Sequence, residues 1–266
     1  MVQKKEQLKL SVFLRKLQES GKYSFCTSEY KKASGKSPVA VQATLRRAIH
    51  KGVIVTPYRS FYVIVPPEYR SLGCLPADQF IPDLMKYLDE DYYVGLLSAA
   101  SYYGAAHHAP QVFQVIVKKN RPTITVGKIK IEFVAKKSFE HTHRQILNTK
   151  VGTINVSTPE MTAMDLVAYR DRCGGLDNVA SVLDDLKENM RSSRLTKLAR
   201  EIGPVNISQR LGYLLQFLQG ESLTVSLAKY IATAKPRFTK LDPSLPAQGP
   251  KDETWRLIIN HIIEVD

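Results

Sequence analysis

The residue pattern changes from helical to extended at Gly52, within the first 70 residues of a 266-residue chain. Before Gly52, apolar residues recur at helical spacing in three short segments. After it come two β-rich runs, 53–56 and 61–65, around Pro57-Tyr58-Arg59-Ser60, which predict a hairpin with a basic, aromatic tip. Three helices followed by a two-stranded hairpin is the order of a winged helix-turn-helix domain, so we expect residues 1–70 to form one.

Capping residues predict where these helices begin and end. The first should end at Gly21, which suits a left-handed cap. The second should begin at a hydroxyl cap, Thr27 or Ser28, and stop at the Ser-Gly pair 34–35. The third is predicted most clearly, because Ser37 supplies a cap hydroxyl and the proline after it suits the first helical position.

The positive charge of the chain is concentrated in this first segment. Residues 1–70 contain 14 Lys/Arg and 4 Asp/Glu, a balance of +10, whereas residues 71–157 have +3 and residues 158–266 have zero. A cationic module on a nearly neutral remainder indicates a polyanionic partner that is bound at one end of the chain.

The outward face of the third helix has side chains suited to reading DNA bases. Val41, Leu45, Ala48 and Ile49 should pack on the first two helices, which leaves Ala40, Gln42, Ala43, Arg46, Arg47 and His50 outside. The small Ala40 and Ala43 allow close approach to the major groove. Gln42 can pair with adenine, and Arg46 or Arg47 with guanine, each contact giving about 1–3 kcal/mol of discrimination.

Further cations flank this face and suit phosphate contacts, which give affinity and salt dependence rather than base choice. The complete predicted DNA-binding set is Lys31, Lys32, Lys36, Ser37, Gln42, Arg46, Arg47, Lys51, Tyr58 and Arg59. Two alternatives stay open at this point. Arg46 and Arg47 could form an ordinary solvated helix face, and a winged helix can also bind proteins.

A proline-marked stretch, residues 71–82, predicts a semi-rigid linker to an α+β domain over residues 83–266. The predicted helices are 80–88, 92–103, 160–169, 176–189, 193–202, 208–218 and 223–232, and the predicted strands are 112–117, 123–126, 129–135, 144–147 and 151–156. We expect the strands to form a mostly antiparallel sheet, the second domain to end in a helical part, and the tail after it to be loop-like. Thr158-Pro159 is a strong helix start, and Trp255 is expected to fill a core.

We find no catalytic signature in the sequence, and therefore expect no enzyme activity, no cofactor and no metal. Phosphate-binding glycine loops and nucleophile elbows are absent. His107-His108 and His141-x-His143 lack a cysteine or paired carboxylate at ligand spacing, so surface loops are the better interpretation. The three cysteines are widely spaced, and no apolar run is long enough for a bilayer, which predicts a cytoplasmic protein without membrane contact.

Seven cations between residues 118 and 137 allow more than one interpretation. They are Lys118, Lys119, Arg121, Lys128, Lys130, Lys136 and Lys137. They could extend a nucleic-acid surface, meet an acidic protein, or protect a sheet edge from aggregation.

Several segments in a fixed order resemble one protein family. After the basic winged helix and the proline-marked boundary come YYVGLLSAASYYGAAHHAPQVFQVIV, a strand-rich block and STPEMTAMDLVAY, and the chain ends in LDPSLPAQGPKDETWRLIIN. This order resembles the AbiEi family, the antitoxins and transcriptional regulators of bacterial type IV toxin–antitoxin systems that act in abortive infection.

The resemblance implies a division of labour. A winged helix would bind inverted repeats in the promoter of its own operon, with two copies on DNA, and repress transcription. The larger domain would counter a co-encoded nucleotidyltransferase toxin without a stable complex. Carried onto this chain, the DNA role falls on residues 37–51 and on Tyr58-Arg59. Two other functions stay open: a nucleic-acid-acting enzyme targeted by the winged helix, and a ligand-responsive regulator.

Overall fold

The computed structural model describes residues 8–105, 111–137, 139, 142–202 and 204–265. Contacts between Cα atoms divide the chain into two compact units. The first unit contains residues 1–92, 111–135 and 146–155, and the second contains residues 93–110, 136–145 and 156–266. Both units contain helices and strands, so the chain is α+β, as predicted.

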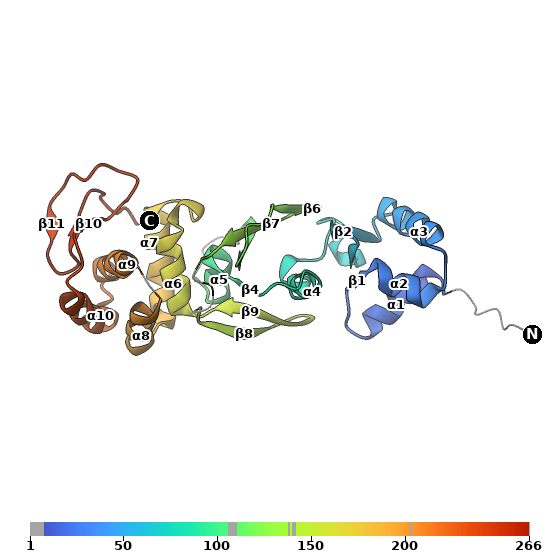
Figure 1. The fold of residues 1–266 in the computed structure, drawn as a ribbon, viewed down its shortest axis with the longest axis horizontal. Coiled ribbons are helices and arrows are strands. Elements are labelled where there is room, and N and C mark those ends of the chain that lie inside the picture. The colour runs from blue at the N-terminus through green and yellow to red at the C-terminus, as the bar shows by residue number, and fades with distance from the viewer. Residues whose placement is uncertain (1–7, 106–110, 138, 140–141, 203, 266) are drawn as a thin grey trace, which may run out of the picture. The chain divides into compact units, whose positions relative to one another are not determined.

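The first unit begins with the predicted order of helices and strands (Figure 1). Its first elements are α1 (Leu10–Glu19), β1 (Ser24–Cys26), α2 (Thr27–Ser34), α3 (Pro38–His50), β2 (Ile54–Tyr58) and β3 (Phe61–Ile64). The strands form an antiparallel sheet in the order β1-β3-β2. Strand β1 was not predicted, because three residues are too few to show an alternating pattern.

The structure confirms one predicted helix start and corrects another. Ser37 caps α3, since its Oγ accepts a hydrogen bond from the backbone N of Ala40 at 3.3 Å. The expected cap of α2 by Thr27 or Ser28 is wrong, because both residues lie inside the helix and Cys26 is its N-cap. The carboxylate of Glu29 takes over the capping role and accepts a hydrogen bond from the Cys26 backbone N at 2.6 Å.

One apolar core joins α1, α2, α3 and the hairpin of β2 and β3. It contains Phe13, Leu14, Phe25, Tyr30, Val41, Leu45, Ala48, Ile54 and Ile64. The ring of Phe13 lies 5.3 Å from that of Phe25 and 5.2 Å from that of Tyr30, centroid to centroid. Because α3 buries its inward residues in this core, the rotation of the helix is fixed and so is the set of side chains on its outer face.

Residues 66–92 continue the first unit with two 3-10 turns, Pro67–Tyr69 and Ala77–Gln79, and with helix α4 (Ile81–Tyr87). Within the expected linker, Cys74 and Leu75 are buried. The backbone N of Lys128 donates a hydrogen bond to the Leu72 carbonyl oxygen at 2.7 Å. The expected linker thus supplies buried side chains to the first unit, and the domain boundaries 1–70 and 83–266 stay a prediction.

The larger sheet is mixed rather than mostly antiparallel. Its strands are β4 (Tyr92–Val94), β5 (Val112–Val117), β6 (Ile124–Val126), β7 (Ile129–Ala135), β8 (Arg144–Thr149) and β9 (Gly152–Ser157), in the order β6-β7-β5-β4-β9-β8. Strand β6 pairs antiparallel with β7 as predicted, but β5 pairs parallel with β7, and β4 parallel with β9. The burial of consecutive residues 115–117 in β5 is typical of parallel strands, whereas residue alternation alone does not encode strand direction.

The predicted helix over 92–103 is wrong in its first part. Tyr92–Val94 form strand β4, and helix α5 (Leu96–Tyr102) begins only after Gly95. Two aromatic residues and a valine favour a strand, and the Leu96 backbone is left-handed, with a φ of +56° at the junction.

The second unit is organised around a helix that is buried along almost its whole length. Its long helices are α6 (Pro159–Ala168), α7 (Leu176–Leu186), α8 (Ser192–Glu201), α9 (Val205–Phe217) and α10 (Glu221–Ala234), with 3-10 turns at Arg170–Arg172 and Lys187–Asn189. These confirm the predicted helices. Thr158 caps α6 as predicted, accepting a hydrogen bond from the Met161 backbone N at 3.3 Å. Helix α6 contacts α5, α7, α8 and α9, which explains why it exposes so little surface.

The C-terminal tail is more ordered than its loop-like sequence predicted. It forms a small sheet of β10 (Thr239–Lys240), β11 (Lys251–Asp252) and β12 (Leu257–Ile258), with β12 in the middle. Trp255 is fully buried, which confirms its predicted role in a core. Its indole Nε1 donates to Gln216 Oε1 at 2.6 Å, and its ring covers Gly212 on α9.

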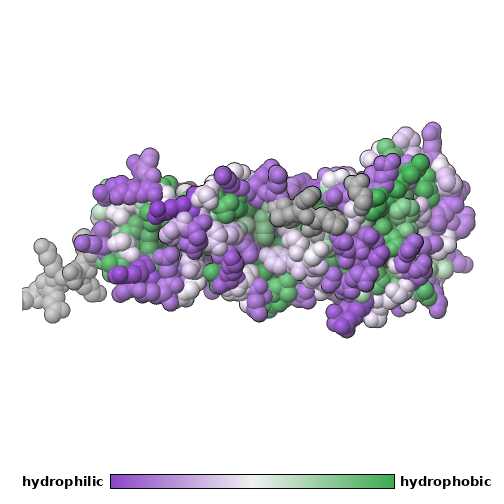
Figure 2. All heavy atoms as spheres, turned by 180° about the vertical axis from the view of Figure 1, so that it is seen from behind, coloured by the Kyte–Doolittle hydropathy of each residue, from purple (hydrophilic) through white to green (hydrophobic). Residues whose placement is uncertain are grey.

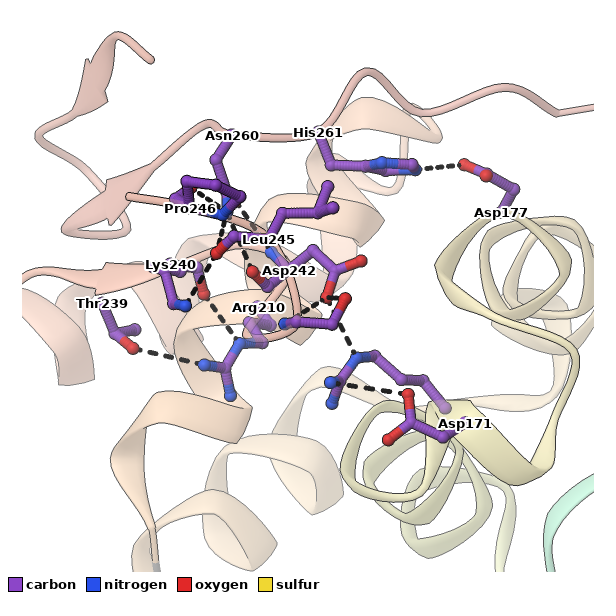
Figure 3. Close-up of polar contacts among 12 residues, drawn as sticks. Asp171, Asp177, Arg210, Thr239, Lys240, Asp242, Leu245, Pro246, Asn260 and His261 are labelled. Carbon is purple, nitrogen blue, oxygen red and sulfur yellow. Dashed lines mark hydrogen bonds and ion pairs between the residues drawn. The ribbon is translucent and has the colours of Figure 1, made fainter. Parts of the chain in front are cut away.

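Polar contacts hold this tail on the helices (Figure 3). The Asn260 amide donates to the carbonyl oxygens of Asp242 and Pro246, both at 2.9 Å. The Arg210 guanidinium on α9 donates to the Lys240 carbonyl oxygen at 2.9 Å. Burial, together with the neighbouring Arg170 guanidinium, lowers the pKa of Arg210 to about 10, so the group stays charged at neutral pH. These contacts account for the order of a tail with almost no regular structure.

Among the described residues, no helix combines the length and the apolar character needed to cross a bilayer.

Candidate nucleic-acid interface

The outer face of α3 is open to solvent as the sequence predicted. Ala40, Gln42, Ala43, Arg46, Arg47 and His50 are all exposed, and Val41, Leu45 and Ala48 are buried. The prediction was wrong for Ile49, which is 36% exposed because it lies at the margin of the inward stripe. Val39 is 80% exposed, so the first turn of α3 also presents apolar surface.

Positive charge dominates this surface. From Thr27 to Gly52 the chain has six Lys/Arg and a single acidic residue, Glu29. Glu29 is occupied by the Cys26 amide and by Lys22 Nζ at 3.0 Å. Within the described part of the chain, no carboxylate forms an ion pair with Lys31, Lys32, Lys36, Arg46, Arg47, Lys51 or Arg59. Figure 2 shows hydrophilic side chains over most of the visible surface of the N-terminal elements, at left.

The two α3 arginines differ in their local contacts. Arg47 Nε donates a hydrogen bond to the Ala43 carbonyl oxygen at 3.2 Å, so this side chain lies back along its own helix. No hydrogen bond to a described residue holds Arg46. Arg46 is therefore the arginine that can turn outward without breaking a contact.

The hairpin tip is tighter than the sequence predicted. Pro57 and Tyr58 belong to β2, Tyr58 pairs with Phe61, and the turn itself is Arg59-Ser60. Ser60, the second residue of this turn, has a left-handed backbone with a φ of +61°. Tyr58 is 39% exposed and Arg59 is exposed, so the basic and aromatic groups expected at the tip do face solvent.

Helix α4 contributes a residue that the sequence did not indicate. The Tyr87 hydroxyl donates to the Arg59 carbonyl oxygen at 3.2 Å, and its ring centroid lies 5.4 Å from that of Phe61. Ser24 Oγ donates to Asp83 Oδ2 at 2.5 Å, which ties α4 to β1. Tyr87 lies outside the predicted domain 1–70, and no sequence signal could place it beside the hairpin.

The cation row between residues 118 and 137 does not form one uniform exposed surface. Lys136 is only 7% exposed, because β7 ends at Ala135 and the strand alternation stops there. Arg121 forms an ion pair with Glu90. Lys119, Lys128, Lys130 and Lys137 are exposed.

Lys136 belongs to a buried polar group in the second unit. Its Nζ lies 2.5 Å from Asp165 Oδ1, and the Tyr93 hydroxyl donates to Asp165 Oδ2 at 2.8 Å. Burial raises the pKa of Asp165, and the Lys136 charge opposes that rise. Because all three side chains are buried and pair with one another, they join β4 to α6 and do not form an open reactive site.

The histidines give no sign of a metal site in the described residues. His143 Nε2 contacts Glu201 Oε2 at 3.1 Å, and no group of three or more His, Cys, Asp or Glu suited to a metal occurs in that part of the chain. His107, His108 and His141 lie outside the described residues.

Comparison with known proteins gives a family match over part of the chain. A family model described as the AbiEi antitoxin C-terminal domain matches residues 93–217. No curated protein matches the sequence. The RV2827C protein from Mycobacterium tuberculosis has a similar structure, with a TM-score of 0.66 and 15% identity, covering 93% of this chain and 89% of that one. At this identity the likeness shows a shared fold.

A second solved structure is much less similar. It is an antigenic nucleotidyltransferase-like protein from Paracoccidioides brasiliensis, with a TM-score of 0.36 and 14% identity, covering 55% of this chain and 88% of that one. This similarity is too low to carry an argument.

Proposed function

We propose that this chain, whose residues 93–217 belong to the AbiEi antitoxin C-terminal domain family, is an antitoxin that also represses its own operon by binding DNA through residues 1–70. Those residues act as a winged helix, with α3 as the recognition helix and the hairpin of β2 and β3 as the wing. Two copies bind inverted repeats in the promoter, because one recognition helix reads only a few base pairs.

The observation that carries this proposal is the exposure of basic and base-reading side chains on the outer face of α3. A 13-residue helix spans about 20 Å, and its exposed residues include Gln42 and Arg46, which can pair with base edges in the major groove. No carboxylate lies on α3. Such a face attracts DNA from a distance and can also read a sequence, whereas a protein-binding face would need no such excess of positive charge.

The remaining residues of the predicted set surround this face. Lys31 and Lys32 are exposed on α2, Lys36 and Ser37 precede α3, Lys51 follows it, and Tyr58 and Arg59 form the wing tip. We assign Gln42, Arg46 and Arg47 to base contacts and the others to phosphates. The Ser37 hydroxyl accepts from the Ala40 amide and keeps its own proton for a phosphate oxygen.

The second domain, which we delimit as residues 83–266, performs the antitoxin function. Its family description supports an antitoxin. We propose that the system is type IV, that the counterpart is a co-encoded nucleotidyltransferase toxin opposed without a stable complex, and that the chain itself is not an enzyme. The alternative function, a nucleic-acid-acting enzyme, has its own test. It would be supported if the pure protein cleaved nucleic acid or transferred a label when given nucleic acid, Mg²⁺ and nucleotides.

The test is a binding titration of the full chain with its own upstream DNA and with a scrambled duplex of equal length. Removing both arginines in Arg46→Ala/Arg47→Ala should weaken binding to the upstream DNA at least about tenfold. The preference over scrambled DNA should fall as well.

The matched control is Arg15→Ala/Lys16→Ala, which removes two exposed charges from α1 of the same unit. It should leave the preference between the two duplexes unchanged. Unaltered binding by the α3 variant would end the proposal for DNA recognition, and the antitoxin assignment would stand independently.

A further inference from the structure

Helices α8 and α10 pack side by side in the second unit (Figure 1). Residues of both helices line a polar hollow of about 370 Å³. All six residues that line it have polar side chains. They are Ser193, Thr196, Lys197, Arg200 and Glu201 from α8, and Ser226 from α10. Neither the DNA-binding face nor the buried group around Lys136 includes any of these residues.

Thr196 is the residue that a structural role does not explain. It is 7% exposed, and its hydroxyl oxygen forms no hydrogen bond with any described residue. A helical threonine commonly donates to the carbonyl four residues earlier, as Thr44 does to Ala40 on α3 at 2.8 Å. A buried hydroxyl without a partner costs stability, and a ligand oxygen that reached it would supply the missing hydrogen bond.

Two cations line the hollow on the α8 side. Lys197 and Arg200 are three residues apart on α8 and therefore lie on the same face. The Arg200 guanidinium lies 5.8 Å from the ring centroid of Tyr230 on α10, and this contact holds the planar group in place. The Lys197 side chain is 70% exposed, and its ion pair with Glu201 is long, at 3.9 Å.

Among the described residues of the lining, Glu201 is the one acidic group, and it is engaged on its other side. Its Oε2 contacts His143 Nε2 at 3.1 Å. The hollow therefore keeps a net positive lining, with three hydroxyl groups from Ser193, Thr196 and Ser226 added to the two cations. A carboxylate has two oxygens and cannot use so many donors, whereas a phosphoryl group presents three or four.

The geometry points to a binding site for a phosphoryl group, carried by inorganic phosphate or by a nucleotide. Arg200 supplies a planar fork of N–H donors to two of its oxygens, and Lys197 supplies a point charge. The three hydroxyls, among them the buried Thr196, complete the contacts. This site is separate from the DNA-binding proposal, since α8 and α10 belong to the second unit.

The experiment is calorimetric titration of the full chain with inorganic phosphate at constant ionic strength, with chloride as the reference salt. Wild type should bind phosphate, Arg200→Gln should weaken binding about tenfold or more, and Thr196→Val should weaken it several-fold. Glu201→Gln should strengthen it, because the negative charge found among the described lining residues is removed. A purely structural hollow would show none of these opposite changes.

Two control variants locate the binding. Arg194→Gln removes an exposed arginine from α8 that does not line the hollow, and Arg46→Ala/Arg47→Ala removes the cations of α3. Both should retain the wild-type affinity within about twofold. The proposal is overturned if wild type binds phosphate no better than chloride, or if Arg194→Gln loses as much affinity as Arg200→Gln.

Titrations with pyrophosphate and with each nucleoside triphosphate identify the source of the phosphoryl group. If wild type binds one nucleotide more tightly than inorganic phosphate, and Arg200→Gln loses this affinity, the ligand is a nucleotide. Equal affinity for phosphate and nucleotides identifies the phosphoryl group alone. A failure of all these ligands leaves the antitoxin and DNA-binding assignments unaffected, because neither uses this hollow.

Discussion

The Tyr87 hydroxyl donates a hydrogen bond to the Arg59 carbonyl oxygen at 3.2 Å, and so links helix α4 to the turn of the hairpin. Its ring also lies near Phe61, at 5.4 Å, and near Tyr58, at 6.4 Å. The tip that we assign to phosphate contacts is therefore held from behind by a helix outside the segment 1–70.

Tyr87→Phe should weaken DNA binding without unfolding the protein. The substitution removes the hydroxyl and keeps the ring, so the turn at Arg59 loses one hydrogen bond. The entropy cost of ordering this turn when it binds DNA therefore rises. We expect a loss of two- to fivefold in affinity (about 0.5–1 kcal/mol), measured by fluorescence anisotropy at fixed salt. Tyr230→Phe in the second unit is the control and should bind DNA as wild type does. An unchanged affinity in Tyr87→Phe would remove Tyr87 from the interface.

Lys32→Ala and Arg46→Ala should weaken DNA binding in two different ways. Lys32 lies on the exposed side of α2 and has no base-reading geometry, so its loss should weaken binding to all duplexes equally. It should also reduce the slope of log K against log salt by about 0.9, the value for one phosphate contact. Arg46→Ala should instead change the ratio between the cognate and the scrambled duplex. Titrations at several salt concentrations measure both effects, and identical behaviour of the two variants would refute the division into phosphate and base contacts.

Glu29→Ala should lower stability in a pH-dependent way. Burial tends to raise the pKa of Glu29, but the Cys26 amide and Lys22 outweigh it, and the net pKa lies below the ordinary 4.5. A lowered folded pKa gives stability that is present above pH 4.5 and is lost as pH falls through the folded value. We expect Glu29→Ala to cost about 1 kcal/mol at neutral pH, as a lost helix cap does, and the difference from wild type to shrink below pH 4.5.

Denaturant unfolding at pH 7 and at about pH 3.5 measures this difference. Glu29→Gln is the matched variant, because glutamine keeps an oxygen for the Cys26 amide and loses the charge. It should retain most of the stability at pH 7 and show less change with pH. A loss in Glu29→Ala that is equal at both pH values would assign the effect to packing.

Lys136→Met should destabilise the second unit strongly. It removes the cation beside Asp165 and leaves a buried carboxylate without compensation, which costs about 3–5 kcal/mol. Burial already raises the pKa of Asp165 above its unfolded value, and the loss of Lys136 raises it further. The variant should therefore recover stability as pH falls, since protonation removes the buried charge. The double variant Lys136→Met/Asp165→Asn should be less destabilised than Lys136→Met at pH 8, and an equal or larger loss would contradict the ion-pair account.

Gly212→Ala should show how closely Trp255 packs on α9. A Cβ on Gly212 would lie 2.0 Å from Trp255 Cζ3, so the indole has to shift. Overpacking of this kind costs about 1–3 kcal/mol, which thermal unfolding would report as a lower midpoint. Adding Trp255→Phe, which shortens the side chain at that contact, should make the double variant more stable than the sum of the single losses predicts. Additive losses would show that the two residues do not share the contact.

Local sequence signals predicted the elements that carry the candidate interface. The Ser37 cap, the proline after it and the glycine at 52 set the ends of α3, and the spacing of Val41, Leu45 and Ala48 set its orientation. These features act within one or two turns of the chain, so a single sequence reveals them.

The features that the sequence did not reveal depend on contacts between distant residues. Tyr87 meets Arg59 across 28 positions, and Lys136 meets Asp165 across 29. The parallel pairing of β5 with β7 likewise leaves no trace in residue alternation, which has the same period for either direction. In the tail, Asn260 replaces regular structure by binding carbonyl groups 14 and 18 residues earlier, a pattern that no local propensity predicts.

Trp255 lies beyond residue 217, where the family match ends, yet it fills the interior against Gly212 and Gln216 within the matched range. The residues that match the family model are therefore fewer than the residues needed to complete the packing around α9. A protein cut after residue 217 would keep every family residue and still expose the apolar side of α9. Antitoxin activity assayed on such a fragment would report the lost packing of Trp255 against α9. The effects of single residues are therefore judged on the full chain.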